Sequence, residues 1–194
     1  MSVSFNTFVV RMTDKIILGV DPGSNITGYG ILHIKKQELF LTTAGVLDNS
    51  SEDDHYTKLH HIFNGVLKLI DDYHPDELAI EEPFYGKNVQ SMLKLGRAQG
   101  VAIAAALYRN LPVTGYSPRK IKQSITGKGN ASKEQVASML HRLLHFENEL
   151  KFLDATDALA VALCHYFQNG KATTKSANYS GWKSFLQQNP GRIN

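Results

Sequence analysis

Four acidic residues stand where the sequence predicts that strands end or that a helix begins. They are Asp21, Glu81, Asp154 and Asp157. The first two each follow a short apolar run, and the last two open a segment rich in alanine and leucine, where residues three apart share one face of a helix. Clustered carboxylates repel one another unless a cation lies between them. We therefore regard the four acids as candidate ligands of a divalent metal ion.

The oxygen ligands define the metal and the chemistry that this site predicts. Carboxylates favour Mg²⁺ or Mn²⁺ over zinc, and the sequence offers no histidine or cysteine cluster that would favour zinc. Two such ions about 4 Å apart can activate a water molecule and stabilise the departing oxygen when a phosphodiester is hydrolysed. We expect a Mg²⁺-dependent nuclease with two ions per subunit, for which Mn²⁺ is a substitute.

Each acid also has an ordinary structural explanation. Asp21 precedes Pro-Gly in a common turn sequence, and Glu81 with Glu82 could form an exposed strand end. Asp154 could cap a helix, and Asp157 could interact favourably with the dipole in its first turn. The placement of all four at the ends of elements favours a shared site over four separate explanations.

Charge is distributed unevenly along the chain, although the net charge is only +3. Residues 48–82 contain ten acidic and two basic residues, whereas residues 117–142 contain six basic residues and one acidic residue. A concentrated basic stretch suits a polyanion such as DNA, and a solvated surface is the simple alternative. The candidates for DNA contact in this stretch are Arg119, Lys122, Lys128 and Lys133.

Hydrophobic periodicity and turn residues predict an α/β fold: a five-stranded mixed sheet flanked by helices, in a single domain. The expected strands are 15–20, 28–35, 39–47, 78–80 and 112–116, the first three forming an antiparallel meander. The expected helices are 53 or 54 to 73, 89–108, a short basic one from 117, one from 132 and 154–167. Parallel first and fourth strands would place Asp21 beside Glu81, beyond the carboxyl ends of the sheet.

Two local patterns add to this outline. Gly96, Gly100 and Ala104 recur every four residues of the helix 89–108, so one face has almost no side chains, and either the sheet or a second subunit packs there. Ser132 and Gln135 form a capping box that starts the next helix, after a flexible loop at 127–130.

Composition narrows the class of protein. The 194 residues favour one domain, and no apolar run approaches the roughly 18–20 residues of a membrane span. A single cysteine, Cys164, excludes an internal disulfide. We expect a cytoplasmic protein without a membrane segment.

Five stretches together resemble the RuvC family of Holliday junction resolvases, within the RNase H-like superfamily. They are GVDPGSNITGYGIL (19–32), LAIEEPFYGKN (78–88), LKLGRAQGVAIAAA (93–106), SPRKIKQSITGKGNASKEQV (117–136) and LDATDALAVAL (153–163). The resemblance runs in the right order from about Lys15 to Phe167, some four-fifths of the chain. It implies an RNase H-like fold and a structure-selective endonuclease of DNA recombination and repair.

The resemblance also implies roles for individual residues. The four acids are the catalytic, metal-binding residues, and Lys122 and Lys133 match lysines that act near the scissile phosphate. Phe84 matches an aromatic residue that opens or stacks bases at the junction, while Lys87, Asn88 and Arg97 match DNA contacts less closely. The implied products carry a 5′-phosphate and a 3′-hydroxyl.

Partners and boundaries follow from the same resemblance. The family forms a homodimer that makes paired, symmetric nicks in four-way junction DNA, and it works alongside the RuvA–RuvB branch-migration complex. We assign residues 14–169 to the nuclease domain, residues 1–13 to an N-terminal extension and residues 170–194 to a C-terminal tail. Met12 is a more natural start than Met1, and we expect the segment before it to be disordered, an artefact of the assigned start, or both.

Three other functions are compatible with parts of the pattern. An actin-like or sugar-kinase-like enzyme also places an Asp before a glycine-rich hairpin, but that fold requires two such lobes. A junction-binding module without activity is disfavoured by the presence of all four acids. A related nuclease acting on RNA or on replication intermediates is disfavoured by the lysines of residues 117–136.

Overall fold

The computed structural model describes residues 14–36, 38–82, 88–144 and 153–171. Within these residues the chain forms five strands and five helices, in the order β1 (Lys15–Asp21), β2 (Ile26–Lys35), β3 (Glu38–Asp48), α1 (His55–Tyr73), β4 (Glu77–Glu81), α2 (Val89–Tyr108), β5 (Val113–Tyr116), α3 (Pro118–Thr126), α4 (Lys133–Leu144) and α5 (Leu153–Lys171). Among the described helices, none is both long and apolar enough to cross a membrane. The expected extension and tail lie outside the described residues, apart from the end of α5.

The strands form one mixed sheet in the order β3-β2-β1-β4-β5. β1, β2 and β3 are an antiparallel meander, as the sequence predicted. β1 and β4 are parallel with Val20 opposite Ile80, so the residues that follow, Asp21 and Glu81, lie at the same edge of the sheet. β5 continues the parallel half, with Tyr116 opposite Glu81.

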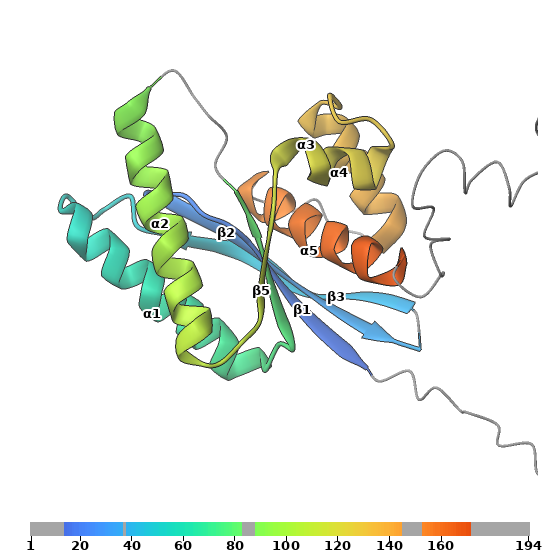
Figure 1. Cartoon of the computed structure of the whole chain (residues 1–194), viewed down its shortest axis with the longest axis horizontal. Helices are drawn as coiled ribbons and strands as arrows, with labels where there is room; N and C mark the ends of the chain where they lie inside the picture. Colours follow the sequence, from blue (N-terminus) through green and yellow to red (C-terminus); the bar gives the residue numbers. More distant parts are fainter. Residues whose placement is uncertain (1–13, 37, 83–87, 145–152, 172–194) are drawn as a thin grey trace, which may run out of the picture.

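Helices cover both faces of the sheet, and each face has its own core (Figure 1). Successive residues of a strand point to opposite faces. Leu18 of β1 thus packs in the cluster that contains α1 and α2, whereas Ile17 packs in the cluster that contains α3, α4 and α5. The expected five-stranded mixed sheet flanked by helices is confirmed.

Helix α5 lies directly on a part of the sheet that has no side chains. Gly19 of β1 pairs with Gly30 of β2. A Cβ atom at Gly19 would lie 2.2 Å from the carbonyl oxygen of Ala158, and one at Gly30 would lie 2.6 Å from Leu159. The absence of side chains at these positions therefore allows α5 to approach the strands closely.

Local signals define several element boundaries. The Asp54 carboxylate accepts a hydrogen bond from the Thr57 amide at 2.7 Å and starts α1. The capping box is confirmed, because the Ser132 amide donates to Gln135 Oε1 at 3.0 Å and the Gln135 amide donates to the Ser132 hydroxyl at 3.3 Å. β2 begins two residues earlier than expected, at Ile26, because its ladder with β3 continues to Asp48.

Candidate active site

Three of the four predicted acids meet at one point of the structure. Asp21 ends β1, and Asp154 and Asp157 lie in the first turns of α5. Each offers a carboxylate oxygen, and these oxygens all lie within 4.8 Å of one another. All three residues are partly buried. An all-oxygen set this compact fits a hard divalent cation such as Mg²⁺ or Mn²⁺.

Glu81 faces the same place from the end of β4. It lines a hollow of about 190 Å³ together with Asp21 and Asp157. The apolar walls come from Pro118, Ile121, Val136 and Ala160, and two lysines complete the lining. The site is therefore a small acidic hollow with both an apolar and a basic boundary.

Burial and mutual repulsion both raise the pKa values of carboxyl groups in the hollow. Burial, followed by the charges of Asp157 and Asp154, raises the pKa of Asp21 to about 6, and Lys133 opposes this shift. Burial, followed by the charges of Asp21 and Asp157, raises the pKa of Glu81 to about 8. A bound cation would favour the ionised form of both acids, so the donor set is one that a divalent ion would stabilise.

Cation binding at this hollow should release protons and strengthen as the pH rises. A carboxyl group with a raised pKa keeps its proton below that pKa, and the proton competes with the metal. We expect Mn²⁺ affinity to increase from about pH 6 to about pH 9, with Glu81 responsible for the upper part of the change. Titration calorimetry in two buffers of different ionisation enthalpy measures the released protons. Glu81→Gln should reduce that release, and an affinity that is constant over this range would contradict competition between the metal and the Glu81 proton.

Two lysines from separate helices face the acids. Lys133, the first residue of α4, forms an ion pair with Asp157, and this contact is the main reason that the pKa of Lys133 is raised. Lys122 lines the hollow from α3, and its charge opposes the raised pKa of Glu81. The structure therefore brings together all six residues that the sequence proposed as catalytic.

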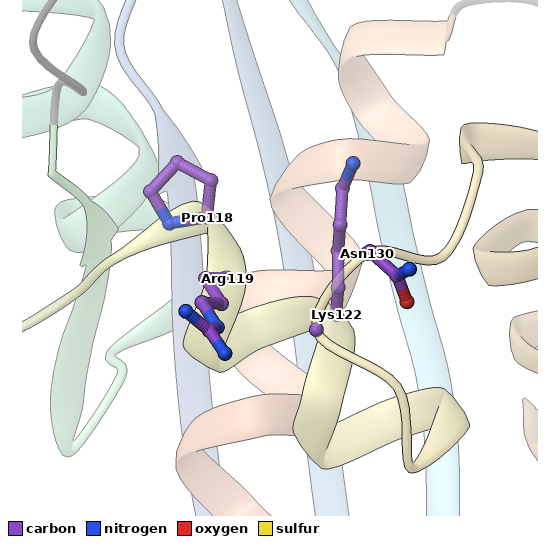
Figure 2. A pocket seen from close by; sticks show the side chains of 5 residues that line it. Pro118, Arg119, Lys122 and Asn130 are labelled. Carbon is purple, nitrogen blue, oxygen red and sulfur yellow. The ribbon is translucent and has the colours of Figure 1, made fainter.

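The other DNA-contact candidates are distributed differently. Arg119 lines a second hollow beside Lys122 (Figure 2). Lys128 is exposed on the turn after α3 and Arg97 is exposed on α2, and neither residue lines the acidic hollow. Asn88 caps α2, and its side chain accepts a hydrogen bond from the Ser91 amide at 3.1 Å. Phe84 and Lys87 are outside the described residues.

Gly28 is a residue whose importance the sequence motif did not explain. It lies opposite Asp21 in the β1–β2 ladder. A Cβ atom at Gly28 would lie 2.1 Å from the carbonyl oxygen of Asp154 and 3.3 Å from its Cβ. This glycine therefore sets how closely the first turn of α5, with two of the acids, approaches Asp21. Its signal in the sequence was a glycine in a strand rich in β-branched residues.

The second half of α5 is fixed by a polar network on the same face of the sheet. His165 is buried, and its Nδ1 lies 2.8 Å from the hydroxyl of Tyr116 at the end of β5. Its Nε2 contacts the Glu77 carboxylate at the start of β4, and Lys15 Nζ lies 2.7 Å from the same carboxylate. α5 is thus anchored to β1, β4 and β5 beyond the acids that it carries.

The family model and the named relatives in the sequence comparison agree on one family. The family described as crossover junction endodeoxyribonuclease RuvC matches residues 17–165. A protein of that name from Cytophaga hutchinsonii is 57% identical over 183 residues, which are 94% of this chain and 90% of the relative. Another from Christiangramia forsetii is 52% identical over 193 residues, and the alignment covers 100% of this chain and 100% of the relative.

Solved structures show the same relationship. Thermus thermophilus RuvC in complex with a Holliday junction substrate aligns with a TM-score of 0.76 and 30% identity, over 82% of this chain and 97% of that chain. The fowlpox virus Holliday junction resolvase shares the fold, with a TM-score of 0.52 and 15% identity over 79% of this chain. The matched residues 17–165 contain the acids, the lysines and the sheet that positions them. On the strength of that match and of relatives more than half identical over nearly their whole length, the chain belongs to the RuvC family of crossover junction endodeoxyribonucleases.

Proposed function

We propose that this protein resolves four-way DNA junctions by paired, symmetric hydrolysis of one phosphodiester in each of two strands. The observation that carries the proposal is the convergence of four acids and two lysines at one edge of the sheet. The substrate is cellular DNA, so a cytoplasmic location and a role in recombination and repair belong to the same proposal. We also infer from the family resemblance that the protein works alongside the RuvA–RuvB branch-migration complex.

The four acids would hold Mg²⁺, and the chain's own groups would position the phosphate. Bound Mg²⁺ supplies activation of the attacking water and stabilisation of the departing oxygen. Asp21 is central among the acids, because it belongs to the compact trio that it forms with Asp154 and Asp157, and its charge raises the pKa of Glu81 more than the charge of Asp157 does. Lys122 and Lys133 place positive charge beside the acids, where the negative charge on the phosphate oxygens grows. The products would carry a 5′-phosphate and a 3′-hydroxyl.

Lys122→Ala should lower the cleavage rate more than it weakens junction binding. The ammonium group faces the acids, so its main effect is expected in the transition state, with a loss of about 10²-fold in rate. Single-turnover cleavage and gel-shift titration measure the two effects separately. Lys120→Ala, on the same helix and exposed, is the matched control. A collapse of binding with an unchanged single-turnover rate would make Lys122 an anchor for DNA only.

An outward face of α2 supports a homodimer. The small-residue face does not pack on the sheet, since a Cβ at Gly96 or Gly100 would meet no described atom within 4 Å. Large apolar side chains continue the same face and are exposed: Val89 66%, Leu93 52% and Leu107 58%. An apolar helix face of this kind on the surface favours association, and a second copy of the chain would complete it. Two copies would provide the two active sites that paired nicks require.

Gly100→Leu should convert the dimer to a monomer. The branched side chain would stand in the middle of a face that otherwise allows close approach of two helices. Sedimentation equilibrium measures the outcome, and Arg142→Leu on the exposed side of α4 controls for added apolar surface. A Gly100→Leu protein that remains dimeric would place the interface elsewhere.

Cleavage of a mobile four-way junction tests the proposal as a whole. With Mg²⁺ we expect paired nicks in strands of like polarity and little cutting of a linear duplex of the same sequence. Ca²⁺ in place of Mg²⁺ should allow binding to be measured without cleavage. Equal cutting of the linear duplex would refute junction selectivity, and binding without cleavage in Mg²⁺ would support a module that has lost its activity.

A further inference from the structure

A second hollow lies beside the acidic one, at α3. It has a volume of about 680 Å³ and is lined by Pro118, Arg119, Lys122, Gly129 and Asn130. The two hollows share Pro118 and Lys122. Their charges are opposite: Asp21, Glu81 and Asp157 line the first hollow, whereas the residues that line the second include two cations and no acid. A strand with a phosphate over the acids would therefore meet positive charge as soon as it crosses Lys122.

Hydrogen bonds within the chain hold the turn that leads into the wall of this second hollow. The Thr126 hydroxyl lies 2.8 Å from the Lys122 carbonyl oxygen and accepts a hydrogen bond from the Lys128 amide at 3.2 Å. Gly127 has a φ of 76° and donates its amide to the Gln123 carbonyl at 3.0 Å. The turn is thus hydrogen-bonded to α3. It holds the backbone that follows against the helix.

At Gly129, the backbone of this turn lies close to the side chain of Arg119. A Cβ atom at Gly129 would lie 2.7 Å from Arg119 Cγ and 3.2 Å from its Nε. The contact restricts the stem of Arg119, so less conformational entropy is lost when the guanidinium binds a ligand. Figure 2 shows the side chains of Arg119 and Lys122 extending in different directions, with Asn130 beside Lys122. The two cations therefore serve different points along a strand.

The chemistry of the lining identifies the class of ligand. A guanidinium is a planar fork that matches a phosphate group, and an asparagine amide both donates and accepts hydrogen bonds. We propose that this hollow binds the nucleotide adjacent to the scissile phosphate in the cleaved strand, with Arg119 on that nucleotide's phosphate. The inference rests on the proposed function, because it takes the acidic hollow as the place of cleavage. In this proposal Arg119 contacts one particular phosphate. The alternative is that its charge only adds to the general electrostatic attraction of DNA.

A cycle that combines protein and substrate changes tests this assignment. Four-way junctions are made with a single neutral methylphosphonate at successive positions on either side of the cut, and single-turnover cleavage is measured for each. With the unaltered protein, neutralising the adjacent phosphate should cost roughly tenfold in rate at subsaturating protein. In Arg119→Ala, neutralising the adjacent phosphate should leave the cleavage rate almost unchanged, because the contact that it would remove is already absent. At other positions, the rate reductions caused by Arg119→Ala and by neutralisation should multiply, as independent effects do.

Two further variants sharpen the test. Lys128→Ala removes an exposed cation from the same turn but outside the hollow. The reduction in cleavage rate that it causes should therefore be independent of the reduction caused by neutralising the adjacent phosphate, and the two should multiply. Gly129→Ala keeps every charge and displaces the Arg119 stem, so it should reproduce part of the Arg119→Ala result. Independent penalties for Arg119→Ala at every position would overturn the assignment and leave the proposed function intact. Failure of the unaltered protein to cleave the unmodified junction would overturn both.

Discussion

Asp21→Asn should abolish junction cleavage and leave junction binding nearly unchanged. The Asp21 carboxylate belongs to the compact trio, and its charge raises the pKa of Glu81 more than the charge of Asp157 does. Asparagine keeps the size of the side chain and one oxygen, but it removes the charge that a divalent cation requires. We expect the single-turnover rate to fall by at least about 10³-fold, because the loss of one residue from a catalytic unit removes most of the contribution of the whole unit.

The variant also has an effect that does not depend on activity. An uncharged residue at position 21 no longer repels the Glu81 carboxylate, so the pKa of Glu81 should fall from about 8. Carboxyl resonances in an NMR titration without metal measure this change. Asp48→Asn, at the end of β3 and outside the trio, is the control and should leave both cleavage and the Glu81 titration as they are. Undiminished nicking by Asp21→Asn would rule out the metal assignment.

Gly28→Ala should raise the Mg²⁺ requirement and slow cleavage, although position 28 carries no charge. The added Cβ would lie 2.1 Å from the Asp154 carbonyl oxygen, a distance that the backbone of α5 must relieve by moving away. The acids on α5 then move away from Asp21. A displacement near 1 Å at a catalytic group can cost roughly 10²-fold in rate.

The comparison that isolates this effect uses a second strand glycine. A Cβ at Gly45 would lie 2.7 Å from the Tyr29 hydroxyl, the end of a side chain that can move. Both variants should lower the melting temperature, but Gly28→Ala alone should increase the Mg²⁺ concentration needed for half-maximal cleavage. Excess Mn²⁺ should restore part of its rate. An unchanged Mg²⁺ requirement in Gly28→Ala would show that the glycine serves packing only.

The sequence predicted the parts of the site that depend on local pattern. Asp21 and Glu81 could be placed because each follows an apolar run, and a parallel pair of strands brings such ends together. The capping box at Ser132 could be read because its hydrogen bonds join residues three apart. The family motifs supplied the identity of the lysines, which no local pattern distinguishes from other surface lysines.

The remaining features depend on packing between distant segments, which local patterns do not contain. Gly28 matters because of its distance to Asp154, which lies on an element far along the chain. The small-residue face of α2 left two alternatives open, and the structure excludes the sheet because Gly96 and Gly100 point away from it. The contact between Gly129 and Arg119, which shapes the second hollow, likewise requires the fold.

The proposed cleavage chemistry requires the acids of β1 and α5 to bind divalent cations together. Anomalous diffraction from crystals grown with Mn²⁺ locates such ions directly. We expect a peak bonded to carboxylate oxygens of Asp21 and of the α5 pair, and loss of that peak in Asp21→Asn. Mn²⁺ bound elsewhere, with no peak between Asp21 and the first turns of α5, would contradict the metal site and the cleavage chemistry derived from it.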